Sequence, residues 1–149
     1  MREYEAVVPV RFAEIDRAGI VYYPRWFHYF HVAFEEFFAA RVGVPYHEMI
    51  DRRRIGFPTV RAECDYRAPL RFGDRLRIGV SVERIGRSSA VLLYRVRTAR
   101  SRRAAAEARI TVVCVDMDTF RPRPIPGDCR GVFERHLPAA RPARGRRRG

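Results

Sequence analysis

The chain has 149 residues and a formal net charge of +13, with 47% hydrophobic and 12% aromatic residues. This length fits one domain that buries a core without a metal or disulfide staple, and the apolar content excludes a wholly disordered chain. No apolar run approaches the roughly 18 residues of a membrane span, so no membrane partner is expected.

The positive charge is carried entirely by arginine, because the chain has no lysine. Five arginines lie in the last twelve residues, which hold no acid and consist mainly of Pro, Ala, Gly and Arg. Such a segment cannot bury enough apolar surface to fold. We expect residues 1–137 to form a single domain and 138–149 a disordered arginine-rich tail. The remaining positive charge suits an anionic ligand but does not choose between phosphate and RNA.

The three cysteines, Cys64, Cys114 and Cys129, are odd in number and form no close sequence pair. Residues 1–6 lack the apolar stretch of a secretory signal. Both features predict a reducing, cytoplasmic location.

The first predicted element is a strand over residues 5–12, where apolar side chains alternate with polar ones. Its buried face is expected to hold Ala6, Val8, Val10 and Phe12. The alternation breaks over residues 13–23, and Pro24 suits the first turn of a helix.

A helix is predicted from Arg25 to about Val42, because apolar side chains lie on nearly all of its sides. Gly43 ends it, and a short second helix is predicted from Pro45 to about Arg53. A helix so apolar must be buried on most sides, which is more than one sheet of this size covers. A second copy of the chain is therefore expected, and with it a homo-oligomer.

Period-two alternation then predicts four strands separated by turn residues, and a last short helix is expected near residues 131–136. The strands span residues 59–67, 75–83, 92–97 and 106–114. They are expected to form an antiparallel meander with one polar face. Together these elements predict an α+β fold, with an antiparallel sheet of about five strands wrapped around one long central helix.

The first candidate for chemistry is Asp16, in the irregular loop between the first strand and the long helix. Gly19 allows a backbone angle that other residues resist. The helix start near Tyr23 offers backbone N–H groups and a partial positive charge. A carboxylate beside such donors can attack a polarised carbonyl or activate water. The alternative is that Asp16 only forms a local turn.

Residues 12–26, FAEIDRAGIVYYPRW, closely resemble the signature of the 4-hydroxybenzoyl-CoA thioesterase family. The resemblance implies a hotdog fold over roughly residues 4–120 and an acyl-CoA substrate. Neither a cofactor nor a metal is expected. The resemblance further implies dimers paired into tetramers, with active sites at subunit interfaces. By the same resemblance Asp16 is the catalytic carboxylate, as nucleophile or general base, and the Tyr23 N–H faces the thioester oxygen.

Further residues are expected around the substrate. Gly19, Tyr22, Trp26, Phe57 and Thr59 are the candidates at the acyl group, although aromatic residues at helical spacing are also typical of a core. The turn over residues 83–89 combines arginines with hydroxyls, a set suited to phosphate. The resemblance implies that this turn contacts CoA. Its expected ligands are Arg84, Arg87, Ser88 and Ser89, and the alternative is an ordinary solvated hairpin tip.

Two rival patterns lie on the long helix. His28, His31 and Glu35 share one helical face and would present three metal ligands, but no further Cys or His pattern completes a site. Glu35 or Glu36 could replace Asp16 as the catalytic acid, as in another branch of hotdog thioesterases.

The favoured function is an acyl-CoA thioesterase for an aromatic or short acyl group. One alternative keeps the fold but takes an acyl-carrier-protein thioester, whose acidic carrier would suit a basic chain. The other is a non-catalytic nucleic-acid-binding protein. The arginine tail lacks the interleaved aromatic residues of that class, so nucleic acid is not an expected partner.

Overall fold

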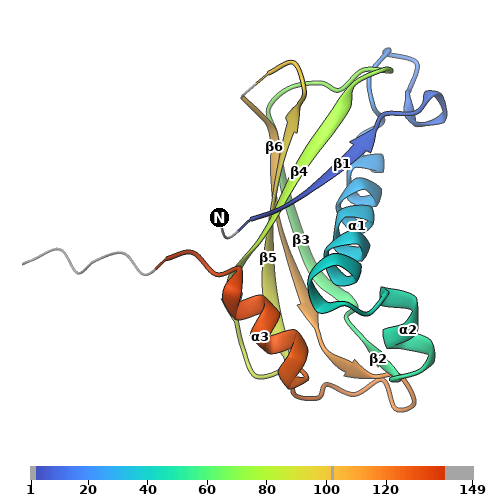
Figure 1. Ribbon diagram of the computed structural model, residues 1–149. Helices are drawn as coiled ribbons and strands as arrows, with labels where there is room; N and C mark the ends of the chain where they lie inside the picture. The colour runs from blue at the N-terminus through green and yellow to red at the C-terminus, as the bar shows by residue number, and fades with distance from the viewer. Residues whose placement is uncertain (1–2, 102, 140–149) are drawn as a thin grey trace, which may run out of the picture.

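A computed structural model describes residues 3–101 and 103–139. Its main sheet has the strand order β1-β4-β5-β6-β3, and all neighbours are antiparallel (Figure 1). The strands are β1 (Tyr4–Pro9), β3 (Thr59–Tyr66), β4 (Arg75–Ile85), β5 (Ser89–Thr98) and β6 (Ala104–Val113). A separate two-stranded ribbon joins β2 (Ile55–Gly56) to β7 (Val115–Asp116). The predicted tail lies almost wholly outside the described residues.

The predicted four-strand meander is correct only for β4, β5 and β6. β3 does not pair with β4, its successor along the chain. It pairs with β6 at the far edge of the sheet, where Glu63 lies opposite Arg109. β1 borders β4 at the other edge. Short turns favour neighbouring strands, but the longer connection over residues 67–74 allows the chain to cross the end of the sheet first.

This crossing connection is anchored along its path. The Arg67 and Ala68 N–H groups donate to the Ala105 carbonyl at 2.8 and 3.1 Å. The Leu70 carbonyl then accepts the Val21 N–H at 2.8 Å, and the Asp74 carbonyl accepts the Val10 N–H at 2.9 Å. The connection therefore passes directly beside the loop that carries Asp16.

The helical layer covers one face of the sheet (Figure 1). α1 (Arg25–Phe37) continues as a π-helical turn, η2 (Phe38–Val42), and Gly43 ends it with φ of +79°. The predicted end of the helix is confirmed, but the layer is not one helix. α2 (Tyr46–Asp51) and α3 (Gly127–Arg135) also belong to it, and α3 begins four residues before the predicted position.

The core lies between this layer and the inner face of the sheet. α1 contributes a row of buried side chains, and the Phe30 and Tyr94 rings meet at 5.2 Å. The row consists of Trp26, Tyr29, Phe30, Ala33, Phe34 and Phe37. Alternate residues of the central strands face it: Leu76, Ile78, Val80, Val82, Leu92, Tyr94 and Val96. The period-two prediction therefore identified the buried face of these strands correctly.

Phe12 does not share the buried face of β1, contrary to prediction. The strand ends at Pro9, and residues Phe12–Glu14 form a 3-10 turn, η1, that carries the ring outward. Phe12 is 79% exposed and meets Phe72 edge-to-face at 5.8 Å. Alternation in the sequence cannot show where a strand gives way to a 3-10 turn, since the side-chain pattern survives the change.

β3 is the strand that the chain covers least. All of its residues except Cys64 are exposed, and its outer edge has no neighbouring strand among the described residues. Val60, expected on an apolar face, is 62% exposed. Within the described ranges, no helix has the length and apolar character needed to cross a membrane.

Candidate active site

Asp16 lies at the start of a tight loop closed by a bridge between Ile15 and Val21. Its N–H donates to the Ile20 carbonyl at 2.9 Å, and its carbonyl accepts the Gly19 N–H at 3.0 Å. Gly19 has φ of +81°, a conformation that favours glycine. The loop is therefore narrow and fixed, and it presents Asp16 half-buried at the end of the sheet.

The Asp16 carboxylate is bound on one side only. Oδ1 accepts the Ala18 N–H at 2.8 Å, which is the local turn that the sequence left open as an alternative. Among the described residues, no donor contacts Oδ2. The turn therefore orients the carboxylate and leaves its second oxygen available for chemistry.

The start of α1 supplies a free backbone donor. Tyr22 donates to the Glu14 carbonyl at 3.0 Å, and Arg25 donates to the Tyr22 carbonyl at 2.8 Å. Pro24 has no N–H. In the part of the chain that the structure describes, the Tyr23 N–H between them donates to no acceptor. It therefore points free at the positive end of a 13-residue helix, where a developing oxyanion is stabilised.

A groove of about 340 Å³ opens beside Tyr23. Its walls come from the start of α1 and from the connection after β3, and the Trp26 and Tyr66 rings meet edge-to-face at 5.2 Å. The Tyr66 hydroxyl donates to the Tyr23 carbonyl at 3.5 Å. Burial, and then the nearby Cys64 thiol, raise the pKa of Tyr66 to about 12, so this hydroxyl stays protonated at neutral pH.

The groove is lined mainly by apolar groups, namely Ile20, Val21, Tyr23, Trp26, Tyr66, Ala68, Pro69 and Leu70, with Arg67 as the one charged side chain in its described lining. Trp26 is thus at the groove, as predicted, while Tyr22 stands outside it and packs its ring on Tyr23 at 5.4 Å. Tyr66 and Arg67 were not among the sequence candidates. The polar–apolar alternation of β3 gives no sign that its last residues meet the helix start.

The remaining candidates lie at the opposite end of the sheet. Thr59 begins β3 and Tyr66 ends it, so seven residue steps of roughly 3.3 Å put about 23 Å between them. Phe57 is buried in the core, where its N–H donates to the Tyr46 hydroxyl at 2.8 Å. Within one chain the structure therefore does not bring Phe57 or Thr59 to Asp16.

The β4–β5 turn, with Arg84, Arg87, Ser88 and Ser89, also lies at this far end. The Gly86 N–H donates to the Ser89 carbonyl at 2.7 Å, and Arg130 Nη2 donates to the Gly86 and Arg87 carbonyls at 2.7 and 3.0 Å. The turn is rigid as a result. Its two arginine side chains are exposed, and neither meets a carboxylate in the described residues. They are free to bind an anion.

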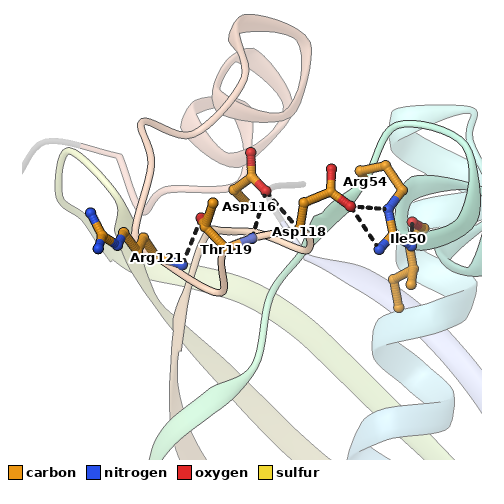
Figure 2. Close-up of polar contacts among 6 residues, drawn as sticks. All are labelled: Ile50, Arg54, Asp116, Asp118, Thr119 and Arg121. Carbon is orange, nitrogen blue, oxygen red and sulfur yellow. Dashed lines mark hydrogen bonds and ion pairs between the residues drawn. The ribbon is translucent and has the colours of Figure 1, made fainter.

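A second turn, over residues 116–119, is held by hydrogen bonds and lies next to the β4–β5 turn (Figure 2). Asp116 Oδ1 accepts the Asp118 and Thr119 N–H groups at 2.7 and 3.2 Å, and Arg54 Nε donates to Asp118 Oδ1 at 3.0 Å. The segment that follows reaches the β4–β5 turn, because the Ile125 N–H donates to the Arg87 carbonyl at 3.0 Å. Sequence reasoning missed this support, although Asp-x-Asp-Thr is typical of an Asx turn.

Of the α1 side chains that were rival candidates to Asp16, two contact each other. His31 Nε2 meets Glu35 Oε1 at 3.2 Å on the exposed side of α1, an ordinary pair one turn apart. The described residues hold no group of three side chains able to bind a metal. Glu35 lies twelve residues from Tyr23, about 18 Å along a helix axis, so neither it nor Glu36 faces the free N–H.

A helix layered on an antiparallel sheet, with a half-free carboxylate and an unpaired N–H beside an apolar groove, defines a protein suited to the hydrolysis of activated acyl groups. Comparison with known proteins makes the class specific. The chain belongs to the thioesterase-like superfamily, whose family model matches residues 10–133. This membership confirms the predicted class of enzyme, a thioesterase, and the hotdog-like fold.

Individual relatives cover most of the chain. A 1,4-dihydroxy-2-naphthoyl-CoA hydrolase from Synechococcus elongatus is 31% identical over 127 residues, which are 85% of this chain and 91% of the relative. The acyl-CoA thioesterase YbgC from Haemophilus influenzae is 24% identical over 130 residues, 87% and 93% of the two chains. The solved structure of a gentisyl-coenzyme A thioesterase is 31% identical with a TM-score of 0.77, covering 85% and 99%.

The resemblance inferred from residues 12–26 is thus confirmed at the level of the superfamily. Its narrower form is not, since two of these relatives are named for other esters, dihydroxynaphthoyl-CoA and gentisyl-coenzyme A, and the third is named for acyl-CoA in general.

Proposed function

We propose that the chain is an acyl-CoA thioesterase that uses Asp16 and the Tyr23 N–H. The observation that carries the proposal is the unpaired Tyr23 N–H at the start of α1, opening on the groove that follows the Asp16 loop. The N–H and the helix dipole polarise the thioester carbonyl. Asp16 then either attacks the carbonyl carbon, expels the CoA thiolate and leaves an anhydride for water to open, or takes the proton of an attacking water. Both routes yield the free acid and CoA.

The proposed site is shared between two chains. Asp16 and the groove lie at one end of the sheet, and Thr59 and the β4–β5 turn lie at the other. β3 runs between these ends with an exposed face and an edge that has no neighbour in the described chain. Antiparallel pairing of β3 with its copy about a two-fold axis brings the Tyr66 end of one chain to the Thr59 end of the other. This supports a homodimer; the pairing of two dimers into a tetramer rests on the resemblance of residues 12–26 alone.

Within this dimer the predicted residues acquire their roles. Gly19 and Trp26 lie on the acyl side of one chain and Thr59 on the approaching end of the partner, whereas Tyr22 stands outside the groove and Phe57 supports that end from the core. Arg84, Arg87, Ser88 and Ser89 hold the phosphates of CoA, since free guanidinium groups and hydroxyls suit them. The three unpaired thiols support a reducing cytoplasm as the location.

The acyl group is inferred to be aromatic. Trp26 and Tyr66 give the groove flat walls, and two relatives are named for dihydroxynaphthoyl and gentisyl esters, both of which have aromatic rings. 4-Hydroxybenzoyl-CoA belongs to this class, and short aliphatic esters remain a comparison for the assay.

Thiol release from benzoyl, 4-hydroxybenzoyl, phenylacetyl and acetyl esters of CoA tests the function, with an acyl-carrier-protein thioester in parallel. We expect aryl-CoA esters to have the largest kcat/KM. Hydrolysis of the carrier-protein ester alone would replace CoA as the substrate, and no thiol release from any ester would refute the proposal.

Complementation tests the shared site. Asp16→Asn chains are co-assembled with Arg84→Ala/Arg87→Ala chains. In each heterodimer one site then carries both defects and the other carries none, so a random mixture regains about a quarter of the wild-type sites at low substrate concentration. If Asp16 and the turn served the same site from one chain, every site would keep a defect and mixing would restore nothing.

A further inference from the structure

Arg67 is the charged member of the groove beside Tyr23. Its backbone is fixed, because its N–H and that of Ala68 both donate to the Ala105 carbonyl. Its side chain is exposed and meets no carboxylate among the described residues. Arg67 therefore lines the groove on a fixed backbone, and within the described chain no carboxylate neutralises its guanidinium.

Three arginines of the sheet differ in this respect. Arg77 pairs with Glu5 at 3.0 Å, Arg109 pairs with Glu83 at 3.0 Å, and Arg95 lies 3.5 Å from Glu107. Those charges are matched on the outer face of the sheet. Arg67, in the lining of a mainly apolar groove, is a different case, since a ligand that fills the groove removes part of the water around it and favours an anionic group beside it.

The position of Arg67 relates it to the acyl group. It follows Tyr66, whose hydroxyl reaches the Tyr23 carbonyl and whose ring meets Trp26. A thioester held at the Tyr23 N–H would place its acyl group against these two rings. A flat ring with a substituent directed at the connection after β3 would then bring that substituent to Arg67.

We propose, on the basis of the function above, that Arg67 selects aryl-CoA esters whose ring carries a carboxylate. A carboxylate accepts two parallel N–H bonds from a guanidinium, and such charge-assisted pairs are roughly twice as strong as neutral ones. A phenol is neutral at pH 7 and offers one ordinary hydrogen bond. Arg67 is thus a specificity-determining residue, and Asp16 performs the same hydrolysis on every ester.

The test compares benzoyl-CoA, 4-hydroxybenzoyl-CoA and 4-carboxybenzoyl-CoA. For the wild type we expect kcat/KM to be about tenfold higher for the carboxylated ring than for benzoyl-CoA, the effect of one partly exposed charged pair. Arg67→Gln should bring this ratio close to one. Arg67→Lys keeps the charge without the fork, so its ratio should lie between the two.

Arg71→Gln is the matched control. Arg71 lies four residues further along the same connection, is exposed, and is absent from the lining of the groove. Its replacement removes one charge near the site, so it measures the general attraction of a basic protein for a more anionic ester. The tenfold ratio should survive in this variant.

The outcomes separate the two proposals. If no CoA ester releases thiol, the proposed function fails. If benzoyl-CoA is hydrolysed but the wild type shows no preference for the carboxylated ring, the function stands and the role of Arg67 is refuted. The role is also refuted if Arg67→Gln lowers kcat/KM equally for all three esters, or if Arg71→Gln abolishes the ratio as well.

Discussion

Replacing Asp16 by Asn separates the structural role of this side chain in its loop from its proposed catalytic role. Asn retains an oxygen that can accept the Ala18 N–H, now at 2.8 Å from Oδ1, so the turn of the loop is kept. The carboxamide has neither the charge of a nucleophile nor the basicity to take a proton from water. Folding and turnover should therefore respond differently to one substitution.

The magnitudes follow from these contacts. Asp16→Asn should change the free energy of unfolding by no more than about 0.5 kcal/mol, the usual range of a surface substitution. kcat should fall by about 10² to 10⁴, the contribution of a positioned base. Some rate above the uncatalysed reaction should remain, because the Tyr23 N–H still polarises the carbonyl. Asp16→Ala also removes the acceptor of the turn and should cost about 1 kcal/mol more.

Two assays on the same preparations decide the matter. Urea unfolding gives the stability of wild type and both variants, and thiol release from saturating aryl-CoA gives kcat. An Asp16→Asn enzyme that keeps kcat within tenfold of the wild type would refute the catalytic role. A large loss of stability in the same variant would show instead that the carboxylate is needed to hold the loop.

Two further predictions concern stability. Gly19→Ala and Gly73→Ala should each lower the free energy of unfolding in urea by about 1 kcal/mol, because both residues have positive φ. An added Cβ meets nothing within 4 Å at either position, so the cost is that of the backbone conformation alone. Only Gly19→Ala, which strains the Asp16 loop, should also lower kcat, and an equal kcat loss in both variants would contradict this. Burial raises the pKa of Cys129 to about 12 from an ordinary value of 9.0, so the unfolded state loses this proton first as pH rises. The stability that the group contributes is complete below pH 9 and falls by up to about 1.4 kcal/mol per pH unit above it; Cys129→Ala should show a shallower decline across pH 9 to 11, and an unchanged slope would contradict the prediction.

Local patterns of the sequence were sufficient for one half of the candidate site. Asp16, Gly19 and Tyr23 lie within eight consecutive residues, so a strand end, a flexible position and a helix start could be recognised together. The end of the long helix at Gly43 followed from the same kind of local signal. Phe12 is the exception, because a 3-10 turn leaves the hydrophobic pattern unchanged.

The other half of the site depends on pairings that no local pattern specifies. Tyr66 reaches Tyr23 across 43 residues of sequence, and it does so because β3 pairs with β6 rather than β4. Strand alternation assigns side chains to faces but leaves the order of strands undetermined. The groove wall and Arg67 were therefore missed, and Phe57 and Thr59 were grouped with residues that lie at the opposite end of the sheet in one chain.

The arginines of the chain are distributed differently on the outer face of the sheet and at its two ends. On the outer face of the sheet several arginines are matched by glutamates, as in the contacts of Arg77 with Glu5 and Arg109 with Glu83. The guanidinium groups left unmatched in the described residues include Arg67 at one end of the sheet and Arg87 at the other. In a single chain they serve no common ligand.

In the proposed dimer each end meets the opposite end of the partner, so Arg67 of one chain and the β4–β5 turn of the other converge on one substrate. An acyl-CoA ester with a carboxylated ring carries anionic groups at both of its ends. Because Arg67 and the arginines of the β4–β5 turn lie at opposite ends of one chain, only two chains together can bind both anionic ends of such an ester.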